Sequence, residues 1–202
     1  MIHVPPVPAG IAEAVAALRR GHVVAYPTET VYGLAVDPWN EPALERLYHV
    51  KGRPAHNPVL LAVADDAQLQ AVVATVPAAA RPYMAAFWPG ALTLLFPRHP
   101  ELPQAVTAGA SKVAVRCPAH EVVRQLCRAF GGAVTSTSAN HAGMPPARTP
   151  AALAQLQGVS VVIDAGPLPE CALSTLFDPE TGEILRAGAI SAAELARVWA
   201  PD

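Results

Sequence analysis

The amino-acid sequence predicts an α/β fold built on an open, twisted and mixed β-sheet with flanking helices. Segments with helical periodicity alternate along the chain with short apolar segments of strand character, which is typical of this class. The last two predicted strands are adjacent in sequence, so antiparallel as well as parallel pairs are expected. Hydrophobic residues make up 52% of the chain and charged residues 15%, which excludes intrinsic disorder and a coiled coil.

The first half of the chain predicts three helices and three strands. Apolar residues between Ile11 and Leu18 fall on one helical face, and Gly21 is placed to end that helix. Asn40 is a favourable N-cap for the second helix, which is expected to close at Gly52. The predicted helices cover residues 11–18, 40–51 and 79–87, and the predicted strands cover 22–26, 58–63 and 91–96.

The second half predicts five strands and three helices. Residues 112–116 alternate between polar and apolar types, as a strand with one polar face does. The sequence Asp-Pro-Glu-Thr-Gly at 178–182 has turn composition and separates two short strands that should form a hairpin. The predicted strands cover residues 112–116, 133–137, 159–163, 174–177 and 183–186, and the predicted helices cover 122–130, 150–156 and 191–199.

Length and cysteine use bear on domain number and compartment. A chain of 202 residues predicts one compact domain over residues 1–202 that needs no disulfide. Cys117, Cys127 and Cys171 form no CxxC pair, which indicates a reducing compartment. The sequence shows no secretory signal and no apolar segment long enough to cross a bilayer, so we expect a soluble, cytoplasmic protein without membrane association.

The charge balance argues against a nucleic-acid surface that covers the whole molecule. The net charge is −2, so any basic site must be local. Only two of the 14 basic side chains are lysines, which makes their positions informative. Lys51 lies at the end of a predicted helix, two residues before Arg53, and Lys112 opens the strand that ends at Arg116. Taken singly, these pairs are better explained by helix-dipole compensation and a solvated strand face than by an anion site.

The usual signatures of nucleotide, zinc and serine-hydrolase sites are absent. The sequence contains no GxGxxG after a strand, and Gly109-Ala-Ser-Lys112 is too short for a phosphate loop. No HExxH or paired Cys/His spacing predicts a metal held by the protein. His141 follows Ser138 closely, but no Gly-x-Ser-x-Gly elbow surrounds the serine, which disfavours a hydrolase triad.

Two polar segments begin where predicted strands end, the position at which ligands bind in open α/β sheets. Hydroxyl and amide groups in 135–143 suit phosphate oxygens and a purine edge, but they also suit an ordinary turn. Residues 27–33, Pro-Thr-Glu-Thr-Val-Tyr-Gly, could hold the ammonium and hydroxyl of an amino acid. They could equally cap a short helix, with Glu29 as the buried partner of an arginine. Arg186 is a further candidate that alone would be a surface arginine.

Taken together, these segments resemble the YrdC/TsaC family of threonylcarbamoyl-AMP synthases. Six motifs occur in the order of the family, and the similarity runs from about residue 10 to 190. The matching segments are GHVVAYPTETVYGL at 21–34, KGRPAHNP at 51–58, FWPGALT at 87–93, VAVR at 113–116 with Pro118 and His120, STSAN at 136–140 with Gly143, and Ser174-Thr175 with ILRAG at 184–188.

The resemblance implies a fold, a reaction and partners. The implied fold is a YrdC-like open twisted sheet around a large concave cavity. The implied reaction converts L-threonine, bicarbonate and ATP, which enters with Mg²⁺, to threonylcarbamoyl-AMP and pyrophosphate. The product would serve a downstream threonylcarbamoyl-transferase complex that modifies adenosine beside the anticodon in tRNA.

The resemblance also implies roles for individual residues. The family's KxR and SxN motifs mark its ATP site, which makes Lys51 and Arg53 the expected catalytic residues. A fork-shaped guanidinium suits a substrate carboxylate, which fits Arg116. The implied ATP-binding residues are Lys51, Arg53, Asn57, Lys112 (through its side chain or backbone), Ser136, Ser138, Asn140 and Arg186, and the implied threonine-binding residues are Thr30, Arg116 and Ser174.

One family feature is missing, and two alternatives stay open. Some relatives carry a histidine after the segment that ends at Pro58, where this chain has Leu-Leu-Ala-Val at 60–63. Members with a second, C-terminal domain are longer than 202 residues, so the resemblance predicts the short, standalone bacterial type. One alternative is a nucleotide-binding paralogue without synthase activity. The other is an RNA-binding protein, which the net charge of −2 weakens. A weak tRNA contact beside catalysis would use the arginines at 53, 116, 148 and 186.

Overall fold

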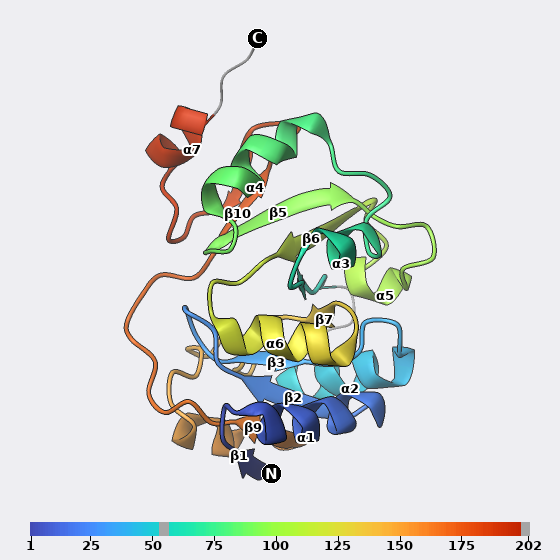
Figure 1. The fold of residues 1–202 in the computed structure, drawn as a ribbon, viewed down its shortest axis with the longest axis vertical. Coiled ribbons are helices and arrows are strands. Elements are labelled where there is room, and N and C mark those ends of the chain that lie inside the picture. Colours follow the sequence, from blue (N-terminus) through green and yellow to red (C-terminus); the bar gives the residue numbers. More distant parts are fainter. Residues whose placement is uncertain (53–56, 199–202) are drawn as a thin grey trace.

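The computed structural model describes residues 1–52 and 57–198, which form two β-sheets with helices around them (Figure 1). Both sheets mix parallel and antiparallel pairs, which confirms the predicted α/β class but divides the strands between two sheets instead of one. The first sheet has the order β1 (Ile2–Val4), β9 (Val159–Ile163), β2 (Val23–Tyr26), β3 (Gly33–Ala35), β8 (Thr137–Ser138). The second has the order β11 (Glu183–Arg186), β10 (Thr175–Asp178), β5 (Leu92–Pro97), β6 (Lys112–Arg116), β4 (Leu61–Ala62), β7 (Val134–Thr135).

The helices begin and end where local chemistry favours a boundary. The Asn40 side chain accepts a hydrogen bond of 3.1 Å from the Ala43 N–H, and Gly52 ends the same helix in the left-handed region at φ 55°. Ser191 and Glu194 cap the last helix reciprocally. The α-helices are α1 (Pro8–Arg19), α2 (Glu41–Lys51), α3 (Asp66–Gln70), α4 (Arg81–Phe87), α5 (Gln104–Thr107), α6 (Glu121–Phe130) and α7 (Ala192–Val198), with 3₁₀ segments at Ala78–Ala80 and Ala151–Gln155.

The predicted strand 133–137 is divided between the two sheets. Its first part, β7, pairs with β4, and its last part, β8, pairs with β3. Between them, the Ser136 N–H donates to the Leu60 carbonyl at 2.7 Å, so the chain passes from one sheet to the other at Ser136. This crossing places the hydroxyl-rich segment between the sheets.

Other differences from the sequence prediction are local. The strand predicted over 58–63 is reduced to β4, and the helix predicted near 150–156 is a 3₁₀ segment. Strands β1 and β3 and helices α3 and α5 were not predicted because each has at most five residues, too few to show a period. Position 199, the predicted end of the last helix, lies outside the described residues.

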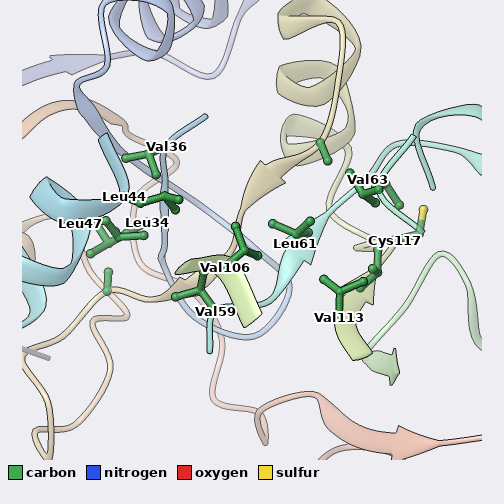
Figure 2. Close-up of a cluster of buried hydrophobic side chains, with 14 of the residues drawn as sticks. Leu34, Val36, Leu44, Leu47, Val59, Leu61, Val63, Val106, Val113 and Cys117 are labelled. Carbon is green, nitrogen blue, oxygen red and sulfur yellow. The ribbon is translucent and has the colours of Figure 1, made fainter. Parts of the chain in front are cut away.

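A continuous apolar core connects the two sheets. Figure 2 shows Leu34 and Leu47 beside Val59 and Val106, and all four belong to one cluster of buried side chains that reaches from the first sheet into the second. A second cluster packs α1 and α6 against strands of both sheets. This packing fixes the distance between the sheets. In the part of the chain that the structure describes, no helix combines the length and apolar character needed to cross a bilayer.

Candidate functional site

A cavity of about 420 Å³ has walls from both sheets, a size typical of small-ligand sites. Strands β3 and β8 contribute from the first sheet, and β5, β6, β10 and β11 contribute from the second. The cavity brings together seven of the residues predicted to form the site. They are Thr30, Lys112, Arg116, Ser136, Ser138, Ser174 and Arg186.

The loop after β2 presents Thr30 to the cavity. Thr28 Oγ1 accepts hydrogen bonds from the Thr30 N–H at 3.0 Å and the Val31 N–H at 3.1 Å, and it donates to the Val31 carbonyl at 2.6 Å. These contacts close a compact turn, and no helix begins here, although the sequence had also allowed one. The Thr30 carbonyl is held by Arg148 Nη1 at 3.0 Å.

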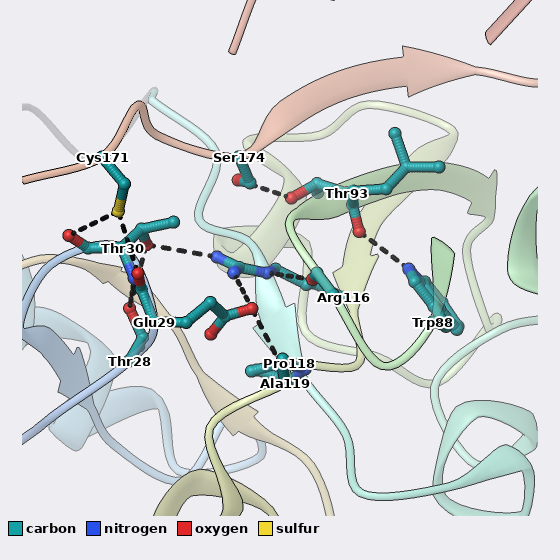
Figure 3. Close-up of polar contacts among 12 residues, drawn as sticks. Thr28, Glu29, Thr30, Trp88, Thr93, Arg116, Pro118, Ala119, Cys171 and Ser174 are labelled. Atoms are coloured by element: carbon teal, nitrogen blue, oxygen red, sulfur yellow. Dashed lines mark hydrogen bonds and ion pairs between the residues drawn. The ribbon is translucent and has the colours of Figure 1, made fainter. Parts of the chain in front are cut away.

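Arg116 is the central cation of this cavity (Figure 3). It is only 4% exposed, and its Nε donates to the Gly90 carbonyl at 2.8 Å. Its Nη2 donates to Glu29 in an ion pair, and its Nη1 lies 3.5 Å from Thr30 Oγ1. Burial alone would raise the pKa of Glu29, but the Arg116 charge and the Ala119 N–H outweigh it and lower that pKa. Glu29 is therefore the partner of an arginine, as one interpretation of the sequence expected, but it is only partly buried, with 24% of its side chain exposed.

A second guanidinium, that of Arg186, belongs to the same cavity. Its Nε and Nη2 donate to the Ser174 carbonyl at 3.2 and 2.9 Å, and Nη2 also donates to Ser174 Oγ at 3.0 Å. Ser174 Oγ lies 2.9 Å from Thr93 Oγ1. Partial burial, followed by the charge of Arg116, lowers the pKa of Arg186. Two positive groups that repel each other across a cavity favour an anion between them.

The Lys112 ammonium is already paired. Its Nζ lies 2.6 Å from Asp178 Oδ2 and 2.9 Å from Glu180 Oε2, both at the β10–β11 hairpin. Burial alone would lower the pKa of Lys112, but hydrogen bonds to these carboxylates outweigh it and raise that pKa. The side chain is therefore less suited to a phosphate than the sequence suggested, which leaves the backbone of this residue as the expected contact.

Lys51 joins the end of α2 to the segment after β8. It is 3% exposed, and its Nζ donates to the Ser138 carbonyl, to the Asn140 carbonyl at 3.1 Å and to Asn140 Oδ1 at 3.2 Å. Ser138 Oγ donates to the same Oδ1 at 2.7 Å. The structure therefore brings Lys51 of the first predicted ATP motif to Ser138 and Asn140 of the second, and of these three residues only Ser138 lines the cavity.

The rest of the first ATP motif is placed only in part. Arg53, an expected catalytic residue, lies outside the described residues. The carbonyl of Asn57 lies 3.2 Å from the hydroxyl of Tyr48, which also lies 2.7 Å from the Ala105 carbonyl. Asn57 is not among the residues that line the cavity.

Two residues near the site have roles that the sequence did not reveal. Arg148 donates to three backbone carbonyls, those of Thr30, Pro169 (2.7 Å) and Cys171 (2.6 Å). Cys171 Sγ donates to the Glu29 carbonyl at 2.9 Å. Both residues tie the segment between β9 and β10 to the Thr30 turn, and since their partners are backbone groups, no sequence pattern could have indicated them. Among the described residues, no cluster of three or more His, Cys, Asp or Glu side chains could hold a metal ion.

Comparison with known proteins gives consistent matches. A family model named for Sua5, YciO and YrdC, with the description "Telomere recombination", matches residues 16–188. The chain is 43% identical over 171 residues to a threonylcarbamoyl-AMP synthase of Thiobacillus denitrificans, with 84% of this chain and 91% of that protein covered. It is 38% identical over 196 residues to a threonylcarbamoyl-AMP synthase of Bacillus subtilis, with 95% of this chain covered.

A solved structure is similar over nearly the whole chain. The crystal structure of Pyrococcus abyssi Sua5 complexed with L-threonine superposes with a TM-score of 0.90 at 33% identity and covers 98% of this chain. This chain spans only 59% of that Sua5 chain and 57% of the Bacillus protein.

Proposed function

This chain belongs to the Sua5/YciO/YrdC family, and from that premise we propose that it is a threonylcarbamoyl-AMP synthase, a nucleotidyltransferase. Its substrates would be L-threonine, bicarbonate and ATP, and its products threonylcarbamoyl-AMP and pyrophosphate. The observation that carries the proposal is the convergence of Arg116 and Arg186 on one cavity beside the hydroxyls of Thr30 and Ser174. Relatives of this length and a longer relative carry the same name, which supports assigning the activity to the region that this chain covers.

The threonine end of the cavity would be built around Arg116. A guanidinium stays charged and offers donors in a plane, which suits a carboxylate. Arg116 has five N–H groups, and three of them are used by Gly90, Glu29 and Thr30, which leaves two for a substrate carboxylate. The hydroxyls of Thr30 and Ser174 would hold the threonine side chain and its hydroxyl.

The nucleotide end would be built around Arg186 and the two ATP motifs. Negative charge increases on the phosphate oxygens when the α-phosphorus is attacked, and Arg186 is placed to stabilise it. Lys51 and Asn140 would act from behind the wall by fixing Ser138, because their polar groups are used within the protein. Mg²⁺ would enter with ATP, held mainly by the phosphates, and would neutralise charge there.

The reaction needs two bond-forming steps. The amine of threonine attacks the carbon of bicarbonate or of carbon dioxide derived from it, which gives a carbamate with loss of water in the bicarbonate case. A carbamate oxygen then attacks the α-phosphorus, and pyrophosphate leaves. A cavity walled by two sheets would hold the unstable carbamate beside ATP and limit its contact with water, so proximity and desolvation would supply much of the acceleration.

We propose two further partners from the family. The product would pass to a threonylcarbamoyl-transferase complex. A weak tRNA contact would have to use exposed cations, because Arg116 is buried and the Arg148 guanidinium is bound to backbone carbonyls. The alternative of an RNA-binding protein without synthase activity predicts steep salt dependence of tRNA binding and no ATP turnover.

Pyrophosphate release tests the proposed function. The purified protein would be incubated with ATP, Mg²⁺, L-threonine and bicarbonate, and each substrate would be omitted in turn. We expect pyrophosphate only in the complete mixture. Release that does not depend on threonine would contradict the proposal, because it would indicate an ATP pyrophosphatase.

A further inference from the structure

Glu29 fixes the orientation of the Arg116 guanidinium. Its Oε1 accepts from Arg116 Nη2 and from the Ala119 N–H at 2.9 Å, so the carboxylate is itself held in place (Figure 3). The Gly90 carbonyl holds Arg116 Nε from another direction. Each of the three guanidinium nitrogens thus donates to a group of the protein, Nη1 to Thr30 Oγ1, so the plane of the guanidinium is fixed and the second N–H groups of Nη1 and Nη2 remain for a ligand.

The second oxygen of Glu29 indicates that this ion pair is not optimised for stability alone. Oε2 is buried and has no hydrogen-bond partner among residues 1–52 and 57–198. Burying an ionised carboxylate with an unpaired oxygen is unfavourable, and a buried ion pair is weak grounds for expecting a gain in stability. The charge at this place is therefore better explained by function than by stability.

The three cations of the cavity wall differ in how far carboxylates compensate their charge, and Glu29 compensates that of Arg116. Lys112 is paired with two carboxylates, and Arg116 is paired with Glu29. Arg186 forms no ion pair with any described residue; its hydrogen bonds go to the carbonyl and hydroxyl of Ser174. The uncompensated positive charge is therefore at Arg186, where a polyanion binds best, while Arg116 offers donors with little net charge.

We propose that Glu29 is a positioning residue that determines specificity at Arg116. By orienting the guanidinium and compensating its charge, Glu29 makes this end of the cavity accept the single carboxylate of a zwitterionic amino acid and reject phosphate groups. The phosphates of ATP are thereby directed to Arg186, and the two substrates do not exchange places. This inference rests on the proposed function and adds to it the reason why two arginines in one cavity bind different anions.

The test compares Glu29→Gln with the wild type, with inorganic phosphate as the probe. The amide keeps the shape of the side chain and removes its charge. We expect the KM for threonine to rise about tenfold, the size of effect of one lost charge-assisted contact, while the KM for ATP changes by less than about twofold. Phosphate should inhibit the variant competitively against threonine at a concentration about tenfold lower than in the wild type.

Two further variants separate charge from structure. Glu29→Asp keeps the charge but shortens the side chain, so it should still exclude phosphate while the KM for threonine rises. Glu121→Gln removes a carboxylate that pairs with Arg124 and Arg128 away from the cavity, and it should leave both KM values and phosphate inhibition unchanged. If Glu29→Gln does not fold, the Glu29→Asp result decides, because equal rises in both KM values or a gain in phosphate inhibition would overturn the inference.

Calorimetry of threonine binding to the wild type keeps the two proposals distinguishable. Absence of threonine binding by the wild type would overturn the proposed function and this inference with it. Threonine binding by the wild type, together with unchanged phosphate inhibition in Glu29→Gln, would overturn only the role of Glu29.

Discussion

Lys51 Nζ lies 3.2 Å from Asn140 Oδ1, although the two residues are 89 positions apart in the sequence. The contact joins the end of α2 to the segment that follows β8. It also fixes Ser138, whose carbonyl accepts from Lys51 Nζ and whose Oγ donates to Asn140 Oδ1. An ammonium group at 3% exposure is expensive to bury unless it is hydrogen-bonded, and oxygens of both Ser138 and Asn140 accept from it. The cavity wall at Ser138, which we propose to be its nucleotide end, is therefore held by a lysine that does not itself line the cavity.

Replacing Lys51 with methionine should destabilise the protein and weaken ATP binding. The apolar chain fills the space, but the oxygens of Ser138 and Asn140 lose their charged donor. We expect a loss of about 1.5–3 kcal/mol in the free energy of unfolding, the range for hydrogen bonds to a charged group. Urea unfolding measures the first effect and the KM for ATP the second. Wild-type stability with a wild-type KM for ATP would show that this contact supports neither the fold nor the site.

The two arginines of the cavity should separate in their effects on the substrates. Arg116→Lys keeps the charge but loses the planar fork, so the KM for threonine should rise ten- to a hundredfold with little change for ATP. Arg186→Lys should raise the KM for ATP and leave the KM for threonine nearly unchanged. Steady-state kinetics with one substrate varied at a time measures both. If both variants raise the KM for threonine alone, Arg186 belongs to the threonine site and the assignment of the two ends is wrong.

The segment between β9 and β10 should loosen when Arg148 is replaced. This segment connects the two sheets along one side of the molecule (Figure 1), and the guanidinium binds its carbonyls at Pro169 and Cys171. Arg148→Met should cost about 1–3 kcal/mol of stability, because the partly buried carbonyls of Thr30 and Cys171 lose a charged donor. It should also increase proteolysis within residues 164–174. Arg128→Met, which removes a contact to the exposed Glu121, is the matched control and should change neither.

His120 should make the stability of the protein depend on pH in a mildly acidic window. Its Nδ1 is buried without a hydrogen-bond partner in the described part of the chain, and burial lowers the pKa of His120 below its usual 6.5. As pH falls through 6.5, the unfolded chain binds a proton there that the folded chain does not yet bind, so folding stability decreases. The contribution of neutral His120 to folding stability is fully present above pH 6.5 and is lost progressively as the pH falls below it.

The His120→Asn variant tests this dependence, because asparagine does not titrate. The difference in unfolding free energy between wild type and variant, measured in urea between pH 7.5 and 5, should shift in favour of the variant as pH falls. A difference that stays constant over this range would show that His120 does not titrate differently in the folded and unfolded states.

The longer elements could be predicted from the sequence because their signals are local. The helix that Asn40 caps, the polar alternation of β6 and the hairpin around residues 178–182 all appear in the structure near the predicted positions. The division of 133–137 between two sheets could not be predicted, because it depends on the carbonyl of Leu60, far away in sequence. The presence of two sheets where one was predicted could not be foreseen either, because it depends on pairing between strands far apart in sequence.

The candidate site residues that lie in family motifs could be predicted from the sequence. The ion pairs that these residues form with other side chains could not. Thr30, Arg116, Ser174 and Arg186 do meet at one cavity. The pairing of Lys112 with two carboxylates could not be predicted. The sequence indicates the β10–β11 hairpin, but it does not show that the side chains of Asp178 and Glu180 point toward Lys112.

The most direct measurement is mass spectrometry of the product formed with ¹³C-bicarbonate. The wild type would be incubated with labelled bicarbonate, ATP, Mg²⁺ and L-threonine, with Arg116→Lys at low threonine concentration as the comparison. We predict threonylcarbamoyl-AMP that carries the label in its carbamoyl group, strongly reduced in the variant and restored when threonine is raised. A folded wild type that binds ATP but forms no labelled adenylate would contradict the account and favour a family member that keeps the cavity without the synthase reaction.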